Sequence, residues 1–197
     1  GTGVKDSKGS SAKAKSDADE KAKERAAEQA AKALADIRYK FATEEEKIAL
    51  DLKKALSDIE KSKVTDAEKV KFRIVAEKEA SDKTIALRVK EFEDIKKLKE
   101  QLIENDLLIA QRSYEIDKAN IQAEFDAKKI SNVQKARLEK ELEDKLREIK
   151  RRGLEDRLAL ENQMSGISGK QGNQNQIMNN ISDLDTDQKV SDTKQVG

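Results

Sequence analysis

Ile48-Ala49-Leu50-Asp51-Leu52-Lys53-Lys54-Ala55-Leu56-Ser57-Asp58-Ile59 is the stretch of sequence that decides the fold. Its regularly placed large apolar residues are Ile48, Leu52, Leu56 and Ile59, at successive spacings of 4, 4 and 3 residues. Side chains three and four residues apart lie on one face of an α-helix. The stretch therefore predicts an amphipathic helix with an apolar repeat of 11 residues.

The same repeat continues in both directions along the chain. Stepping by 11 residues gives a row in which eight positions are large and apolar or aromatic, namely Ile37, Ile48, Ile59, Val70, Phe92, Ile103, Tyr114 and Phe125. We interpret this row, called the eleven-residue stripe below, as a surface for helix packing. Eleven residues in three turns is about 3.67 residues per turn, which is typical of a straight or slightly right-handed coiled coil. After Ser131 a new row begins with Leu138, Leu142 and Leu146.

Helix-breaking residues are confined to the margins of the chain. The 197 residues include no proline, and none of the eight glycines lies between Ser10 and Arg152. Gly costs about 1 kcal/mol and Pro about 3 kcal/mol inside a helix, so their absence favours long helices. We predict a mainly α fold with three parts: a disordered segment over residues 1–15, a long helical coiled-coil region over 16–164, and a polar linker over 165–197 with a short helix around Ile177.

Three motifs predict helix starts or bends inside the helical region. Each is a Ser or Thr followed three residues later by Glu or Gln: Thr43 with Glu46, Thr65 with Glu68, and Ser131 with Gln134. In such a capping box the hydroxyl accepts a hydrogen bond from a free backbone amide of the first turn. We therefore propose Thr43, Thr65 and Ser131 as N-caps, although the motif also arises by chance in a chain rich in Glu.

The composition argues against most kinds of catalytic and metal site. The sequence has no Cys and no His, so it lacks the thiolate nucleophile, the commonest general base and the commonest metal ligand. A site made of carboxylates alone would need a pocket, for which the chain has little apolar material. We predict a non-enzymatic protein with no catalytic residues, no cofactor and no metal ligands.

The charges are numerous but balanced. There are 41 Lys and Arg against 40 Asp and Glu, which gives a net charge of +1. Nucleic-acid-binding proteins usually have a clear basic excess, and membrane-spanning helices need about 20 largely apolar residues in a row. We therefore expect no specific binding of nucleic acid and no membrane insertion by this segment.

Two groups of residues admit a second interpretation. The stripe aromatics Phe92, Tyr114 and Phe125 could stack on nucleic-acid bases, but they share the register of Ile and Val, which favours helix packing. A basic cluster could bind phosphates; its members are Lys145, Arg147, Lys150, Arg151 and Arg152. Acidic residues alternate with these cations at helical spacing, which favours a surface that pairs with itself.

The chain resembles the central region of the tail tape measure proteins of long-tailed phages and prophages. The resemblance lies in residues 88–112, 129–138 and 158–164, and more loosely across residues 20–165. It implies a structural protein inside the tail tube, assembled in the bacterial host cytoplasm, whose length sets the length of the tail. Its implied partners are the tail tube protein and the tail assembly chaperones. We also expect the chain to be a piece of a longer protein.

Other functions fit the same helical pattern. The main alternative is an extended coiled-coil spacer, such as the stalk of a bacteriocin or a cell-surface rod. A membrane-surface helix would need more Lys and Arg on its polar face and Trp or Phe on the other. The apolar rows predict self-association through helices, but they leave open the number of chains and the choice between a straight rod and folded-back hairpins.

Overall fold

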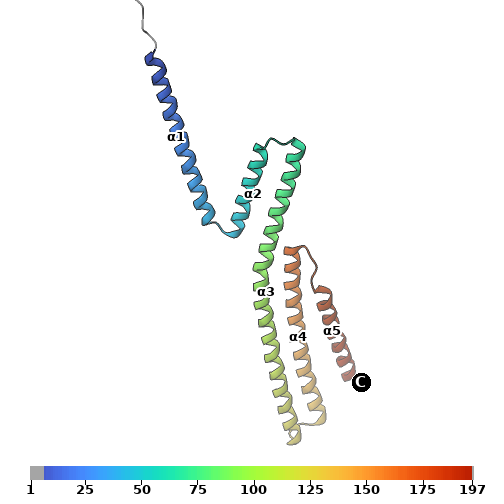
Figure 1. Ribbon diagram of the computed structural model, residues 1–197. Coiled ribbons are helices and arrows are strands. Elements are labelled where there is room, and N and C mark those ends of the chain that lie inside the picture. The colour runs from blue at the N-terminus through green and yellow to red at the C-terminus, as the bar shows by residue number, and fades with distance from the viewer. Residues whose placement is uncertain (1–6, 197) are drawn as a thin grey trace, which may run out of the picture. The chain divides into compact units, whose positions relative to one another are not determined.

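The computed structural model describes residues 7–196 and consists of helices joined by short turns (Figure 1). Their bounds are α1 Ser7–Lys40, α2 Glu44–Lys61, α3 Asp66–Asp126, α4 Asn132–Ser168 and α5 Gln174–Val196. No strand occurs in the described residues. The mainly α prediction is therefore confirmed.

Three of the four breaks between the described helices fall where the capping motifs stand. Thr43 lies at the N-cap of α2, and its hydroxyl accepts a hydrogen bond from the Glu46 amide at 3.2 Å. Thr65 directly precedes α3, and its hydroxyl accepts from the Glu68 amide at 3.2 Å. At α4 the box is complete, because Ser131 and Gln134 each accept a hydrogen bond from the backbone amide of the other, at 3.2 and 2.9 Å.

The chain divides into two compact units between Thr84 and Ile85. The first contains α1, α2 and the beginning of α3. There Tyr39 at the end of α1 donates a hydrogen bond to Asp51 of α2 at 3.3 Å. Arg73 of α3 forms a 2.9 Å ion pair with Glu60 of α2. These contacts link consecutive helices that fold back at a turn.

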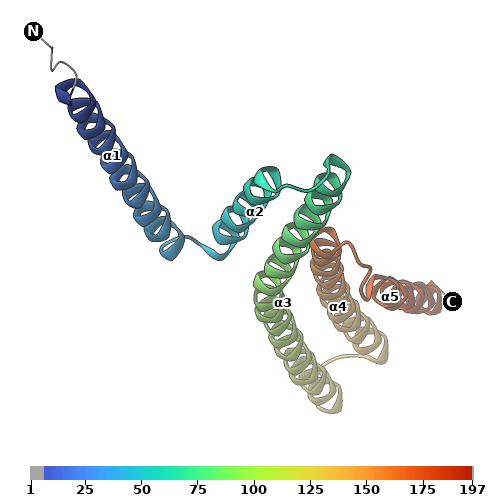
Figure 2. The same cartoon turned by 45° about the horizontal axis from the view of Figure 1, so that its top comes forward.

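The second unit contains the rest of α3 with α4 and α5. In Figures 1 and 2, α4 runs back beside α3 after the turn at residues 127–131, and α5 runs back beside α4. This unit holds the buried apolar side chains of the described structure: Phe92, Leu146, Leu160 and Ile177. The helices of this unit are therefore folded-back hairpins with a thin core.

The turn between α3 and α4 contains an unusual backbone conformation. Lys128 has a φ of 56°, in the left-handed region that usually belongs to glycine. The Lys129 amide donates to the Glu124 carbonyl at 2.9 Å, and the Lys128 amide to the Phe125 carbonyl at 3.0 Å. These bonds close a Schellman-type helix end.

The structure changes two of the predicted boundaries. α1 begins at Ser7, so residues 7–15 of the segment predicted to be disordered are helical, and residues 1–6 lie outside the described part. In place of the polar linker over 165–197, α4 continues to Ser168 and α5 covers Gln174–Val196. The reason for the second change is that the polar residues of α5 pair with charged residues of α4, as described below.

Candidate functional site

The candidate functional site is the set of surfaces through which α3, α4 and α5 contact one another. The eleven-residue stripe supplies much of the α3 surface in this unit. Phe92 is buried at 5% exposure, and Ile103, Tyr114 and Phe125 are half-buried. The stripe therefore becomes a packing surface on this part of α3.

The remaining stripe residues are less covered. Ile48 and Ile59 of α2 are half-buried, whereas Ile37 and Val70 are 54% and 52% exposed. The eight residues thus lie on three helices, with Ile37 in α1, and they do not form one continuous seam. The turns at Thr43 and Thr65 interrupt the row, because each turn changes the direction of the chain.

Gly153 sets the distance between α3 and α4. It is buried in the middle of α4, and a Cβ atom at this position would lie 3.3 Å from Ile103 Cγ2 and 3.6 Å from Leu107 Cδ2. Gly is unfavourable inside a helix by about 1 kcal/mol relative to Ala. Its place in α4 is explained by the close approach of Ile103, a stripe residue, to the α4 backbone.

The same interface contains a buried ion pair. Lys96 Nζ of α3 lies 2.5 Å from Glu161 Oε1 of α4. The Glu161 residue is only 6% exposed. Removing Lys96 would leave the Glu161 charge buried without this partner, which is strongly destabilising. The pair therefore fixes the register of α4 along α3.

Lysine side chains lie over two of the stripe aromatics, so these rings do not present an open surface for stacking on bases. Lys135 Nζ of α4 lies 4.8 Å from the centroid of the Phe125 ring, and Lys118 Nζ lies 5.8 Å from that of Tyr114. Both distances are within the range of cation–π attraction. The half-buried rings of Tyr114 and Phe125 thus belong to the packing surface of α3.

The contact between α4 and α5 includes a ladder of polar side chains. Arg151 of α4 donates two hydrogen bonds to the Asp185 carboxylate, at 2.8 and 3.3 Å. Lys140 of α4 donates to Asp192 at 2.7 Å. Between these rungs Gln188 accepts from Arg147 at 2.8 Å and donates to Asp144 at 2.9 Å. This arrangement holds a helix that has few apolar residues.

The ladder shifts the pKa values of its members in the stabilising direction. The hydrogen bond from Arg151 lowers the pKa of Asp185, and those from Lys140 and Gln188 lower the pKa of Asp192. Desolvation would raise the pKa of Asp144, but hydrogen bonds from Lys140 and Gln188 lower it overall. The pKa of Lys140 is raised above 10.5 by its hydrogen bonds to Asp144 and Asp192.

The beginning of α5 is fastened to α4 by Gln174. This side chain is 7% exposed. Its amide nitrogen donates to the Glu161 carbonyl at 3.2 Å and to the Ser165 hydroxyl, and its oxygen accepts from the Gly172 amide at 2.7 Å. Both amide hydrogens and the amide oxygen of this buried side chain therefore have partners that fasten the start of α5 and its preceding loop to α4.

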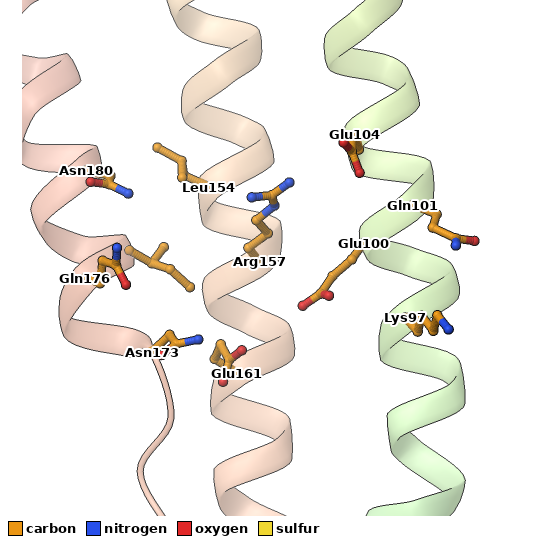
Figure 3. Close-up of a pocket in the computed structure, with 11 residues that line it drawn as sticks. Lys97, Glu100, Gln101, Glu104, Leu154, Arg157, Glu161, Asn173, Gln176 and Asn180 are labelled. Atoms are coloured by element: carbon orange, nitrogen blue, oxygen red, sulfur yellow. The ribbon is translucent and has the colours of Figure 1, made fainter.

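A polar cavity of about 470 Å³ lies among the three helices (Figure 3). Its lining includes Glu100 and Glu104 of α3, Arg157 of α4, Asn173 of the loop before α5, and Gln176 and Asn180 of α5. The Arg157 Nε atom is buried without a hydrogen-bond partner. The cavity is a gap in a polar helix interface, and it gathers no nucleophile with an adjacent base.

Within residues 7–196, no group of three or more acidic residues is placed to hold a metal ion. Among the described helices, none has both the length and the apolar content needed to cross a membrane.

Most residues of the basic cluster pair with acidic residues. Arg147 and Arg151 belong to the ladder, and Arg152 forms a 2.7 Å ion pair with Glu148 one turn away. Sequence reasoning did not single out Gly153, Glu161, Gln174 or Asp185. An isolated glycine inside a helical pattern is the one signal that was available, because such a glycine often has a packing reason.

Comparisons with protein-family models, with curated proteins and with solved structures give no match to this chain.

Proposed function

We propose that the chain is a non-enzymatic structural element that sets a length, as in the tail tape measure proteins that it resembles. The observation that carries the proposal is the conversion of nearly the whole described sequence into long helices. α3 alone has 61 residues, which corresponds to about 90 Å at 1.5 Å per residue. A helix relates residue number to length at a fixed rate, which is the property that a molecular ruler needs.

The surfaces of the helices support this proposal. Charged residues make up 41% of the chain and nearly cancel in sign. A surface of this kind lets a filament lie in a tube and lets DNA pass without strong electrostatic attraction. In the proposed setting the chain lies in the lumen of the virion tail. It contacts the tail tube protein there, and the tail assembly chaperones during assembly in the host cytoplasm.

The folded-back hairpins are compatible with an extended working form. The buried apolar residues are few, and α5 is held to α4 by polar contacts that high salt weakens. Separating the hairpins therefore exposes little additional apolar surface. In this proposal the free chain is folded into hairpins, whereas inside the tail tube the same helices lie end to end.

The test is to change the number of residues and to measure tail length by electron microscopy. An in-frame deletion of residues 93–114 removes two repeats of 11 residues and preserves the register of the eleven-residue stripe. In the encoding phage or prophage, tails should shorten by about 33 Å at 1.5 Å per residue. The matched control replaces Leu108 by Gln in the full-length chain and should leave tail length unchanged.

Tails of unchanged length in the deletion variant would contradict the proposal. If the chain is also missing from purified virions, the alternative of a coiled-coil spacer in a bacteriocin stalk or a cell-surface rod becomes the better explanation. A duplication of residues 93–114 gives the reciprocal test, because it should lengthen tails by about 33 Å.

A further inference from the structure

A second apolar row on α3 is largely exposed in the described part of the chain. Ile95, Leu102, Ile109 and Ile116 follow one another at intervals of seven residues, and Leu98 lies one turn from Ile95. These five side chains are 48–66% exposed. We call this row the seven-residue stripe.

The seven-residue stripe lies on a different face of α3 from the eleven-residue stripe. Positions seven apart drift by about 20° per repeat around a straight helix, so the stripe stays on one side of α3 for its whole length. α5 does not cover it, because the α3 residues that line a cavity with α5 include Glu104, Leu107 and Leu108. On the side of α4, Ile109 lines a shallow groove with Leu142 and Ile149.

We propose that a second copy of this chain packs on the seven-residue stripe, with the two α3 helices parallel and in register. A period of seven is the signature of two helices wound around each other with a left-handed twist, whereas the buried face of α3 follows a period of 11. Ile at three of the four repeating positions suits a two-stranded parallel pair. The inference stands apart from the length-setting role, since a spacer of any kind could dimerise in this way.

The charges beside the stripe favour the parallel orientation. In a parallel pair, Asp94 of one chain lies opposite Lys99 of the other, which gives an attractive pair on each side of the seam. An antiparallel pair over the same stripe, centred on residue 106, would bring the two copies of Asp106 together. Like charges in these positions oppose that arrangement.

The first test measures molar mass by light scattering on the full chain over a range of protein concentration. The wild-type chain of 22.1 kDa should reach twice its monomer mass. A variant with Leu102→Gln and Ile109→Gln should remain monomeric with unchanged helix content. The matched control is Val75→Gln, which alters another exposed aliphatic residue of α3 (63% exposed) that lies outside the stripe and outside the positions flanking it, and it should dimerise like the wild type.

A wild-type chain that stays monomeric at millimolar concentration would overturn the proposal. Equal loss of dimer in the stripe variant and in the Val75 control would overturn it as well. Arg112 falls on the same seam and faces its own copy in the parallel pair, which weakens the dimer. Arg112→Leu should therefore lower the dimer dissociation constant, and an unchanged constant would place the contact elsewhere.

The second test determines orientation by crosslinking and leaves the stripe intact. Because the chain has no cysteine, single substitutions report on chosen contacts. Asn105→Cys places a thiol on the seam opposite its own copy in the parallel pair, so mild oxidation should give a disulfide-linked dimer. Asp106→Cys should crosslink poorly. Efficient crosslinking through position 106 with none through 105 would show an antiparallel pair and contradict the inference.

Discussion

The two faces of α4 in the second unit are built from different chemistry. Toward α3, α4 presents apolar residues and Gly153, whose backbone is close enough to touch Ile103 and Leu107. Toward α5, α4 presents Lys140, Arg147 and Arg151, which pair with acidic and amide side chains. The comparison shows that one helix can be held on one side mainly by close apolar packing, with one buried ion pair, and on the other mainly by paired polar side chains. The two sides should respond to different perturbations.

The largest expected effect comes from filling the space at Gly153. Gly153→Val places a branched side chain against Ile103, and overpacking of this kind costs about 1–3 kcal/mol. The free energy of unfolding, measured by urea denaturation followed by circular dichroism, should fall by that amount. Gly166→Val is the matched control, since a Cβ at Gly166 meets nothing within 4 Å. Equal destabilisation by both variants would show that Gly153 does not set the helix distance.

The second-largest expected effect is a weaker contact between α4 and α5, with the contact between α3 and α4 unchanged. Asp185→Asn removes the negative charge that pairs with Arg151. Because α5 then loses one of its ion pairs with α4, tryptic cleavage at Lys189 in α5 should become several-fold faster. The α3–α4 hairpin should keep its resistance. Asp187→Asn makes the same change of charge on the same helix outside the ladder, so unchanged cleavage is expected there. Mass spectrometry of the fragments measures both rates.

The separation in sequence between contacting residues decides how much of each face could be predicted from the sequence. Ile103, Tyr114 and Phe125 were predicted as packing residues from spacing within one helix, and the structure half-buries all three. Ser131 and Gln134 are three residues apart, so their capping motif is visible in the sequence. The Arg151–Asp185 pair joins residues 34 apart. In a chain with so many charges, nothing local selects that pairing over others.

The length of α5 was missed for the same reason. Its few apolar residues predicted only a short helix around Ile177, and Ile177 is indeed buried. The remainder of α5 is stabilised by Asp185, Gln188 and Asp192, whose partners lie in another helix. A helix that is stabilised by polar partners in another helix shows no periodic apolar pattern in its own sequence, so the pattern cannot predict it.

Acid should weaken the face toward α5 before the face toward α3. The pKa values of Asp144, Asp185 and Asp192 are lowered from 3.8 in the folded chain. Their contribution to stability is therefore present above pH 3.8 and is lost as pH falls through the lowered values. The raised pKa of Lys140 gives a contribution that is complete below pH 10.5 and is lost as pH rises from there through its folded pKa.

A pH titration of the tryptic assay is limited by the protease, so nuclear magnetic resonance is the better measurement. Amide signals of α5 should shift toward random-coil values below pH 3.8, while those of the α3–α4 hairpin persist to lower pH. Simultaneous loss of both sets of signals would mean that the two faces are one cooperative unit.

The smallest expected effect concerns the turn that joins the two sides of the hairpin. Lys128 adopts a φ of 56°, which costs an L-residue about 1 kcal/mol relative to Gly. Lys128→Gly should raise the free energy of unfolding by up to about 1 kcal/mol, less the entropy that Gly adds to the unfolded chain. Gly169→Ala makes the reverse change at the left-handed end of α4, where φ is 71°, and should destabilise. A destabilising Lys128→Gly would contradict this account of the turn.

The most direct test of the contrast between the two faces is native-state hydrogen exchange of the intact chain at low and high salt. Salt screens exposed charge pairs and leaves apolar packing in place. Exchange in α5 should accelerate in 1 M salt, where the screening length is about 3 Å, while protection around Gly153 and Ile103 is retained. Equal protection of α5 at both salt concentrations would contradict the claim that charge holds this helix to α4.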